Sequence, residues 1–386
     1  MSRSPGSRAE YLAARRVLIT GGGTGGHLMP ALAIAARLRE AAPDVEPVLV
    51  GARRGIETDV LARRAFRYHL LPAQPIYRRQ WWKNVRWPFI LPGLWRGLRA
   101  VFARERPAAV LGTGGYASAP VVWWALRRGI PVALQEQNAY PGLVTRRFAA
   151  RAQHVYLGLP EARQHLRLGP HTKILVTGNP IVPPTPGNRV AERAGFGLGQ
   201  GEFTLLVTGG SQGALDINRA VAAWLDAGAS PGVSVLWITG HLSYAEFKRY
   251  HAPPRVHVID FLDPMARGYA VADVVVSRAG ALTVAELCAW GLPSILIPLP
   301  SAAAHHQAKN ADAMEQAGAA VHLNQAHLDA GTLSAAIHRL QTGAATRQAM
   351  SRAARARGRP DAAGDIVSNL LTLLESGGVS QVTETT

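Results

Sequence analysis

A strand that runs straight into a glycine-rich loop and then into a helix constrains this chain more than any other feature. Residues 17–19 are Val, Leu and Ile, as in a buried strand, and residues 21–26 read GGGTGG. From His27 to Leu38, apolar residues recur at helical spacing. Glycines let the backbone approach a ligand closely, and the first turn of a helix offers unpaired N–H groups to an anion. This order of elements predicts an α/β fold with a phosphate-binding loop.

The glycine spacing also fits, loosely, the G-x-G-x-x-G pattern of dinucleotide-binding folds, through Gly21, Gly23 and Gly26. Such folds place an acidic residue about 20 residues further on, where it holds a ribose. Here the next expected strand, residues 47–51, is followed by Ala-Arg-Arg and by no carboxylate. The arginines leave a phosphorylated dinucleotide open as an alternative ligand.

The second half of the chain repeats this opening. Residues 203–208 are predicted to form a strand, and residues 209–214 (GGSQGA) lead into a helix. Four prolines within residues 178–188 mark a linker, and a length of 386 residues favours two domains over one. The expected parts are a disordered basic arm (1–15), a Rossmann-like domain (16–182), a second Rossmann-like domain (183–364), a helix that packs back on the first domain (about 365–376) and a frayed tail (377–386).

The charge balance favours an anionic partner. The chain has 42 Lys and Arg against 25 Asp and Glu, a net charge of +17, which fits a nucleic acid, an anionic lipid, a phosphorylated substrate, or solubility alone. The single cysteine, Cys288, allows no disulfide within the chain and fits a reducing compartment. Residues 1–16 lack the apolar core of a signal peptide, and no apolar run reaches the roughly 18 residues that span a bilayer. We therefore expect a soluble or peripheral protein.

Residues 76–99 combine aromatic and basic side chains unusually densely. The segment reads IYRRQWWKNVRWPFILPGLWRGLR, with four tryptophans among arginines and a lysine. One interpretation is a helix that packs tryptophan inward and leaves arginine in solvent. The other is a membrane-surface patch, in which tryptophan enters the headgroup region and arginine meets lipid phosphate. Arginine and aromatic residues can also grip single-stranded nucleic acid, but no RNA-binding signature accompanies them.

Two further loops are expected at the carboxyl edge of the first sheet. Residues 111–119 read LGTGGYASA, a second glycine turn after a strand, and residues 135–142 read QEQNAYPG. Ligands of open α/β sheets bind at the carboxyl ends of the strands. The polar residues of the second loop could simply complete a turn, but its position favours contact with a ligand.

Residues 277–287, SRAGALTVAEL, place a glycine turn between a buried strand and a helix. Thr283 and Glu286 have the spacing of a capping box. Alternatively, Glu286 accepts hydrogen bonds from ribose hydroxyls while the amides at the helix start hold phosphate. Further on, Gln307 and Asn310 share one helical face, and their amides either cap a helix or suit sugar hydroxyls.

The sequence gives no indication of a metal or cofactor. No Asp-x-Asp pair occurs, although enzymes that hold a sugar nucleotide through a divalent metal commonly use one. No cysteine–histidine cluster suggests zinc, and the adjacent His305 and His306 should point apart. We therefore expect helix N-termini and backbone N–H groups to stabilise the charge of a leaving nucleotide.

Seven short motifs occur along the chain in a characteristic order: GGTGGH (22–27), GTGGY (112–116), EQN (136–138), GNP (178–180), GGSQGA (209–214), SRAGALTVAE (277–286) and HQAKNA (306–311). Together they resemble the MurG family of glycosyltransferases over residues 16 to about 375. The resemblance implies a GT-B fold, with two Rossmann-like domains facing across a cleft. It implies inverting transfer of N-acetylglucosamine from UDP-N-acetylglucosamine to the C4 hydroxyl of the muramyl unit of lipid I. The product would be lipid II, made peripherally at the cytoplasmic face of the cell membrane for peptidoglycan synthesis.

The resemblance also assigns residues to both substrates. The donor would be contacted by Thr24, Gly25, Gly26, Asn138, Ser211, Leu262, Ala281, Leu282, Thr283, Val284, Ala285, Glu286 and Gln307. The pyrophosphate of the acceptor would meet Gly114, Gly115, Tyr116 and Glu136. His27 is the candidate base for the acceptor hydroxyl, because imidazole titrates near neutrality; its alternative role is to order the glycine loop.

Two positions depart from the family pattern. Val182 stands where the family usually has an arginine shortly after GNP, and Gln135 stands where it often has a histidine. The expected partners are UDP-N-acetylglucosamine, lipid I and an anionic membrane surface, with no nucleic acid. The alternatives are a UDP-N-acetylglucosamine 2-epimerase-like isomerase of the same fold, a dinucleotide-dependent oxidoreductase and a non-catalytic membrane-docking protein.

Overall fold

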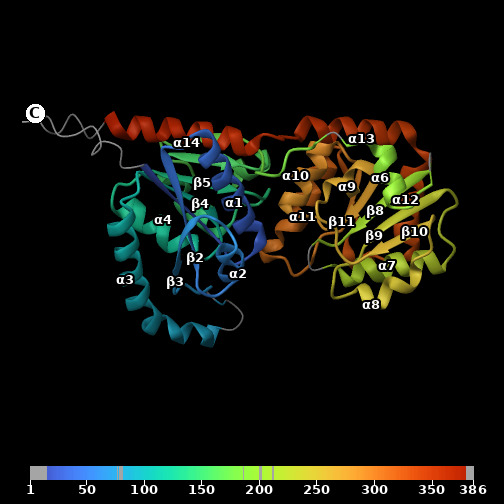
Figure 1. The fold of residues 1–386 in the computed structure, drawn as a ribbon, viewed down its shortest axis with the longest axis horizontal. Helices are drawn as coiled ribbons and strands as arrows, with labels where there is room; N and C mark the ends of the chain where they lie inside the picture. The colour runs from blue at the N-terminus through green and yellow to red at the C-terminus, as the bar shows by residue number, and fades with distance from the viewer. Residues whose placement is uncertain are drawn as a thin grey trace, which may run out of the picture. The chain divides into compact units, whose positions relative to one another are not determined.

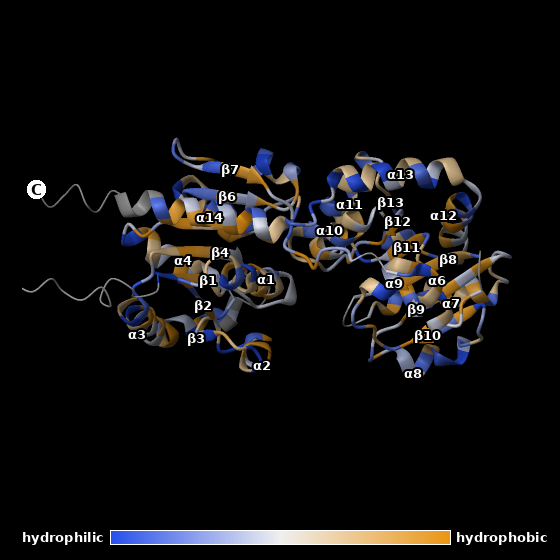
Figure 2. Cartoon of the chain, turned by 45° about the horizontal axis from the view of Figure 1, so that its top comes forward, coloured by the Kyte–Doolittle hydropathy of each residue, from blue (hydrophilic) through white to orange (hydrophobic). Residues whose placement is uncertain are grey.

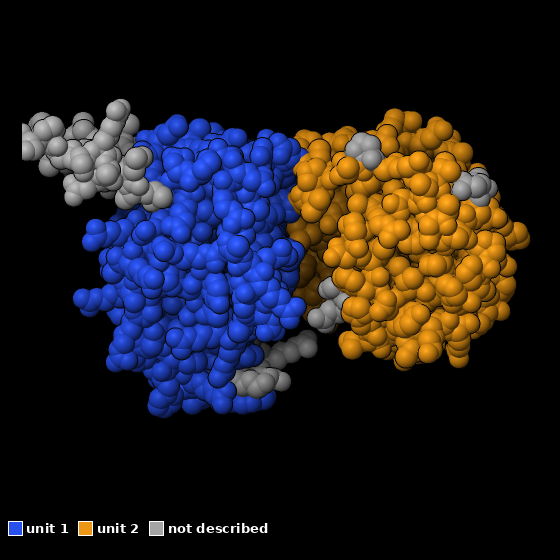
Figure 3. Space-filling model, in the orientation of Figure 1, with its two compact units in different colours: residues 1–137, 141–180, 361–386 blue, residues 138–140, 181–360 orange. Residues whose placement is uncertain are grey.

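The computed structural model describes residues 15–379 apart from residues 76, 78–80, 186, 200–201 and 211–212. The chain forms two compact units (Figure 3). Unit 1 comprises Met1–Gln137, Pro141–Pro180 and Asp361–Thr386, and unit 2 comprises Asn138–Tyr140 and Ile181–Pro360. Each unit is built around one parallel sheet, so the predicted α/β fold with two Rossmann-like parts is confirmed.

Unit 1 contains a seven-stranded parallel sheet in the order β3-β2-β1-β4-β5-β6-β7 (Figure 1). The strands are β1 (Arg15–Gly21), β2 (Val45–Ala52), β3 (Arg67–Leu71), β4 (Ala109–Gly114), β5 (Val132–Glu136), β6 (His154–Leu157) and β7 (Lys173–Val176). The strand order reverses between β1 and β4, and open α/β sheets bind their ligands at the carboxyl side of such a switch point. Both of these strands lead into glycine turns, so the switch point carries the two loops singled out in the sequence.

Helices cover both faces of this sheet. They are α1 (Gly25–Ala41), α2 (Glu57–Ala62), α3 (Trp87–Glu105), α4 (Ser118–Arg127), α5 (Leu143–Phe148) and α14 (Ala362–Val379), with 3-10 turns η2 (Trp81–Arg86), η3 (Ala149–Arg151) and η4 (Pro160–His165). Neighbouring residues of β1 point to opposite faces: Leu18 joins the core that includes α3 and α4, whereas Val17 and Ile19 join the core that includes α1 and α14. Helix α14 therefore completes a core that begins with the first strand. No helix in the described part of the chain is long and apolar enough to cross a membrane.

Unit 2 contains a six-stranded parallel sheet in the order β10-β9-β8-β11-β12-β13. The strands are β8 (Phe203–Thr208), β9 (Val233–Ile238), β10 (Val256–Ile259), β11 (Val274–Ser277), β12 (Ser294–Leu296) and β13 (Ala320–His322). The helices are α6 (Arg189–Gly195), α7 (Leu215–Asp226), α8 (Tyr244–Phe247), α9 (Ala266–Val271), α10 (Ala281–Trp290), α11 (His306–Gln316), α12 (Ala330–Thr342) and α13 (Ala344–Arg357), with 3-10 turns η5 (Lys248–Tyr250), η6 (Ala303–His305) and η7 (Gln325–His327). Here the order reverses between β8 and β11, so the loops after these strands occupy the equivalent switch point. Hydrophobic residues concentrate on the central strands of both units (Figure 2).

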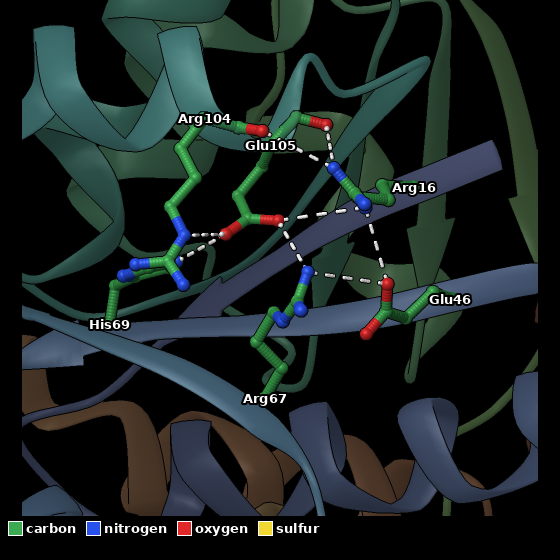
Figure 4. A network of polar contacts seen from close by, with 6 residues as sticks. All are labelled: Arg16, Glu46, Arg67, His69, Arg104 and Glu105. Carbon is green, nitrogen blue, oxygen red and sulfur yellow. Dashed lines mark hydrogen bonds and ion pairs between the residues drawn. The ribbon is translucent and has the colours of Figure 1, made fainter. Parts of the chain in front are cut away.

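A buried carboxylate lies at the opposite, amino-terminal edge of the unit 1 sheet (Figure 4). Glu105, the last residue of α3, has no exposed side-chain surface and is surrounded by basic side chains. His69 Nε2 lies 2.8 Å from its Oε1, and Arg67 and Arg16 lie 3.2 Å and 3.6 Å from its Oε2. Glu46 shares the two arginines but is 35% exposed. This cluster anchors the end of α3 to the start of β1 and to β3.

Candidate active site

The turn between β1 and α1 holds His27 in a defined orientation. The ring Nδ1 lies 3.1 Å from the carbonyl oxygen of Thr113 and 3.0 Å from Oε1 of Gln137, and both partners are acceptors. Nδ1 must therefore carry the proton, which leaves the lone pair on Nε2. The hydroxyl of Thr113 in turn donates to the carbonyl of His27 at 2.8 Å. The imidazole is thus held in place through Nδ1.

The second glycine turn, after β4, packs directly against the first. Gly114 and Gly115 have φ of +95° and +77°, which favours glycine. A Cβ on Gly114 would lie 2.9 Å from Nδ1 of His27, and one on Gly115 would lie 1.9 Å from the carbonyl oxygen of Gly22. The hydroxyl of Tyr116 donates to the carbonyl of Arg54. The structure therefore packs the two glycine turns of unit 1 directly against each other.

The polar loop after β5 is largely occupied with its own hydrogen bonds. Glu136 is 2% exposed, and its Oε2 accepts from the amide of Gly142 (2.9 Å) and the hydroxyl of Thr145 (2.6 Å). Gln135 donates to Asn179 at 3.0 Å, so it joins the QEQN loop to the GNP motif. The carboxylate of Glu136 therefore shapes the start of α5, and its expected contact with an acceptor stays a prediction.

The start of α10 differs from the predicted capping box. The helix begins at Ala281 with Gly280 as its N-cap, and no side chain caps it, so Thr283 lies inside the first turn. The amides of Leu282 and Thr283, in this first turn, have no carbonyl partner within the helix and point toward the position that an anion would take. The carboxylate of Glu286 accepts from the hydroxyl of Tyr269 at 2.7 Å. Burial raises the pKa of Glu286, and the hydrogen bond from Tyr269 offsets only part of this effect.

Asn310 organises unit 2 rather than facing a ligand. Its side chain is fully buried, accepts from the amide of Ala139 (2.8 Å), and donates to Asn138 Oδ1 and to the carbonyl of Ala279, each at 3.1 Å. The side chain of Asn310 is therefore already used within the protein, and of the two predicted sugar-binding amides of α11 only that of Gln307 has a group left for a ligand. Gln307 is half-buried, and its Oε1 accepts from the amide of Leu299 at 2.9 Å, which leaves its amide nitrogen for a ligand.

Other predicted contacts vary in how they are placed. Thr24 and Gly26 are exposed, whereas the side chain of Leu262 is 7% exposed and packs in the core of unit 2, so only its backbone could meet a base. Ser211 lies outside the described residues. Within the described ranges, no three His, Cys, Asp or Glu side chains gather as a metal site would require.

Sequence reasoning missed two buried charged residues beside these loops. Arg278 follows β11 and donates to the carbonyls of Ile297 (3.1 Å) and Pro298 (3.3 Å), so it joins two loops of the carboxyl edge. Burial lowers its pKa. Glu57, at the start of α2, lies under the first glycine turn. In the sequence, each of these residues is only a charged residue near glycines, at a strand end or a helix start. This pattern does not tell whether the side chain is buried or exposed.

The fold and the glycine turns at both switch points define a class of nucleotide-sugar glycosyltransferase. Residues 17–157 match the Glycosyltransferase family 28 N-terminal domain, and residues 204–366 match the Glycosyltransferase family 28 C-terminal domain. A relative from Salinibacter ruber is 40% identical over 366 residues, which is 94% of this chain and 98% of that protein. Its name is UDP-N-acetylglucosamine--N-acetylmuramyl-(pentapeptide) pyrophosphoryl-undecaprenol N-acetylglucosamine transferase. The chain belongs to the MurG family of these transferases.

Solved structures agree with this assignment. The crystal structure of Acinetobacter baumannii MurG has a TM-score of 0.75 and 26% identity, and the match covers 93% of this chain and 99% of that one. A putative UDP-N-acetylglucosamine 2-epimerase from Listeria monocytogenes has a TM-score of 0.64 at 16% identity, covering 92% of this chain and 95% of that one. At that identity the likeness shows a shared fold alone.

Proposed function

We propose that this chain transfers N-acetylglucosamine from UDP-N-acetylglucosamine to the C4 hydroxyl of the muramyl unit of lipid I, with inversion at the anomeric carbon. The observation that carries the proposal is the 40% identity to the Salinibacter ruber transferase over 94% of the chain. The product is lipid II, the disaccharide precursor of peptidoglycan. Both switch points present backbone amides after glycine turns, as a substrate pair with two pyrophosphates requires.

The chemistry needs one base and a stabilised leaving group. Nε2 of His27 accepts the proton of the C4 hydroxyl while that oxygen bonds to the anomeric carbon. The bond from the anomeric carbon to the β-phosphate oxygen of UDP breaks in the same step, and the electron pair leaves with UDP. Amides in the first turn of α10 stabilise the charge that develops on the pyrophosphate, and Glu286 accepts hydrogen bonds from the ribose. Thr24, Gly25, Gly26, Asn138 and Gln307 are the expected contacts of the donor sugar.

A transfer assay tests the reaction directly. Labelled N-acetylglucosamine from the UDP donor should appear on a lipid I analogue, with no requirement for a divalent metal. His27→Ala should lower turnover by about a hundredfold or more, the usual loss for a general base, and leave UDP affinity nearly unchanged. His338→Ala, at an exposed position of α12, is the matched control and should behave as wild type. Unchanged turnover in His27→Ala would remove this residue from the catalytic role, and loss of activity with EDTA would contradict the metal-free mechanism.

The epimerase alternative predicts a different product. An epimerase acting on the donor alone would form UDP-N-acetylmannosamine without any acceptor. The likeness to the Listeria protein concerns the fold, so no observation on this chain favours that reaction. Chromatography of the donor after incubation without lipid I distinguishes the two reactions.

We further propose that η2 and α3 dock this enzyme on an anionic membrane surface, at the cytoplasmic face of the cell membrane. Among the described side chains of this segment, five large hydrophobic ones are exposed: Trp82 (56%), Val85 (64%), Phe89 (83%), Leu91 (50%) and Trp95 (53%). Helix α3 carries hydrophobic and hydrophilic residues side by side (Figure 2). Ile76, Arg78, Arg79 and Gln80, which begin the aromatic and basic segment, lie outside the described residues.

A basic pocket adjoins this apolar surface. The rings of Trp95 and Trp123 lie 5.7 Å apart, and the guanidinium of Arg127 lies 5.0 Å from the ring centre of Trp123. The pocket has a volume of about 450 Å³ and is lined by Trp123, Arg127, Arg147, Phe148 and Arg151. Aromatic rings beside guanidinium groups suit the interface between acyl chains and lipid phosphates.

Vesicle binding tests the docking surface. Phe89→Ser should weaken binding to vesicles containing anionic lipid by roughly tenfold, because burial of a phenyl group contributes about 1.5 kcal/mol or more. Leu242→Ser, at an 85% exposed position of unit 2, is the matched control. Binding should fall as salt increases. Equal binding to neutral vesicles, or equal effects of the two substitutions, would argue against this surface.

A further inference from the structure

Glu57 is a buried carboxylate directly beneath the first glycine turn. It is the first residue of α2 and has no exposed surface. Its Oε1 accepts a hydrogen bond from the amide of Gly23 at 2.7 Å. Its Oε2 is also buried and finds no hydrogen-bond donor among the described residues. A buried carboxylate with an unsatisfied oxygen is costly, so its presence at this position calls for a role.

The surrounding glycines leave room for this carboxylate and nothing larger. A Cβ on Gly22 would lie 1.9 Å from Oε1 of Glu57, and a Cβ on Gly55 would lie 2.1 Å from Oε2. Gly55 also has φ of +147°, which disfavours other residues. The glycine turn after β1 and the loop after β2 are therefore both shaped around the same side chain.

The carboxylate determines which amides of the turn face outward. Because Glu57 binds the amide of Gly23, that group is directed inward. The following amides, of Gly25 and Gly26, open α1 and have no carbonyl partner within the helix. They therefore remain available to an anionic ligand.

Tyr116 extends this arrangement to the second glycine turn. A Cβ on Gly23 would lie 2.5 Å from the ring of Tyr116, so the ring lies tightly against the first turn. Burial, and then the charge of Glu57, raise the pKa of Tyr116, which keeps its hydroxyl protonated as the donor to Arg54. Three segments are thereby held together: the turn after β1, the loop after β2 and the turn after β4.

We infer that Glu57 is a positioning residue for the acceptor: it fixes the two glycine turns of unit 1 in the shape that receives the acceptor pyrophosphate. The inference rests on the proposed function, because it assigns the acceptor to these turns. Glu57 touches no substrate, since its carboxylate lies under the turn. Its loss should therefore change acceptor binding more than the donor site of unit 2.

Steady-state kinetics of Glu57→Ala and Asp59→Asn test the inference. Asp59→Asn removes the same charge from an exposed position in the first turn of the same helix. Glu57→Ala should raise the KM for a lipid I analogue by about tenfold or more, as expected for a lost charge-assisted hydrogen bond. The donor KM should rise by less, because this turn contributes only some of the expected contacts of the donor sugar and the nucleotide contacts lie in unit 2. Asp59→Asn should match wild type, and Glu57→Gln, which keeps an acceptor for Gly23, should lie between them.

Hydrogen exchange of a peptide spanning residues 20–28 gives a readout that does not depend on activity. Exchange should quicken in Glu57→Ala and stay unchanged in Asp59→Asn. If Glu57→Ala does not fold, Gly55→Ala serves instead, since its methyl group displaces the Glu57 carboxylate from outside the turn. It should raise both the acceptor KM and the exchange rate.

Wild-type exchange rates and an unchanged acceptor KM in the folded variants would overturn the inference. An equal rise in donor and acceptor KM would also overturn it, because it would show a general loss of structure. A different result would refute the proposed function: the wild-type chain transfers no sugar, although Glu57→Ala still shows faster hydrogen exchange than wild type. The two failures are therefore distinguishable.

Discussion

Glu105 offers a direct test of how much a buried ion cluster contributes to this fold. Glu105→Gln keeps the shape of the side chain and removes its charge, which leaves Arg16, Arg67 and His69 facing one another (Figure 4). Removal of one partner of a fully buried pair costs about 3–5 kcal/mol. Here Arg67 is 39% exposed and His69 19% exposed, so water can solvate part of the remaining charge. We therefore expect a loss of about 2–3 kcal/mol in the free energy of unfolding.

Glu46→Gln is the matched control for this measurement. Glu46 lies 3.2 Å from Arg16 and 3.6 Å from Arg67, but its side chain is 35% exposed. Exposed ion pairs contribute about 0.2–1 kcal/mol, so the control should be nearly neutral. Urea unfolding followed by tryptophan fluorescence measures both variants. A loss below about 0.5 kcal/mol in Glu105→Gln, or equal losses in both variants, would refute the reasoning.

The pH dependence of this effect has a definite sign. Burial raises the pKa of Glu105, but the hydrogen bond with His69 and the charges of Arg67 and Arg16 outweigh it, so the pKa is lowered from 4.5. A carboxyl group with a lowered folded pKa contributes its full stability above its unfolded pKa and loses it as pH falls through the folded value. The difference between wild type and Glu105→Gln should therefore be complete at pH 7 and shrink in acid below about pH 4.5. A difference that persists unchanged in acid would show that charge is not its source.

Two further predictions concern unit 2. Asn310→Ala removes three hydrogen bonds of a fully buried side chain and should lower the free energy of unfolding by about 2–4 kcal/mol, measured by urea unfolding; a loss under 1 kcal/mol would contradict the role assigned to it. Because the pKa of Glu286 is raised, the donor KM of wild type should increase as pH falls toward that pKa, and Glu286→Gln should abolish this dependence. Tyr269→Phe removes a hydrogen bond that lowers this pKa, so the increase should begin at higher pH; an identical profile would exclude Glu286 as the titrating group.

The sequence predicted the strands at both switch points but missed the edge strands β7 and β13. β1, β4, β8 and β11 are continuous apolar runs followed by glycine, and such runs are the strongest signal for buried parallel strands. β7 (Lys173–Val176) is partly or fully exposed at every residue, and β13 is three residues long. Short or exposed edge strands show neither a continuous apolar run nor a clear alternation, so they were missed.

The site residues that the sequence predicted correctly are those whose conformation depends on local sequence. The glycine turns and His27 were found because local sequence determines a turn and a helix start. The burial of Asn310 could not be predicted, because it depends on a long-range partner: Asn310 binds Ala139, which lies 171 residues away in the sequence. The capping box at Thr283 was wrong because Gly280 already starts the helix three residues earlier.

The return of α14 to the first unit has a consequence for synthesis on the ribosome. Unit 1 takes its core residues Ile366, Val367 and Leu370 from the last helix, whereas nearly all of unit 2 lies in one continuous stretch, Ile181–Pro360. During synthesis, unit 2 can therefore complete its fold before unit 1 does. Chains halted before residue 361 should resist protease over Ile181–Pro360 and be cut within residues 15–180, and the reverse pattern would show that the early strands need no late partner.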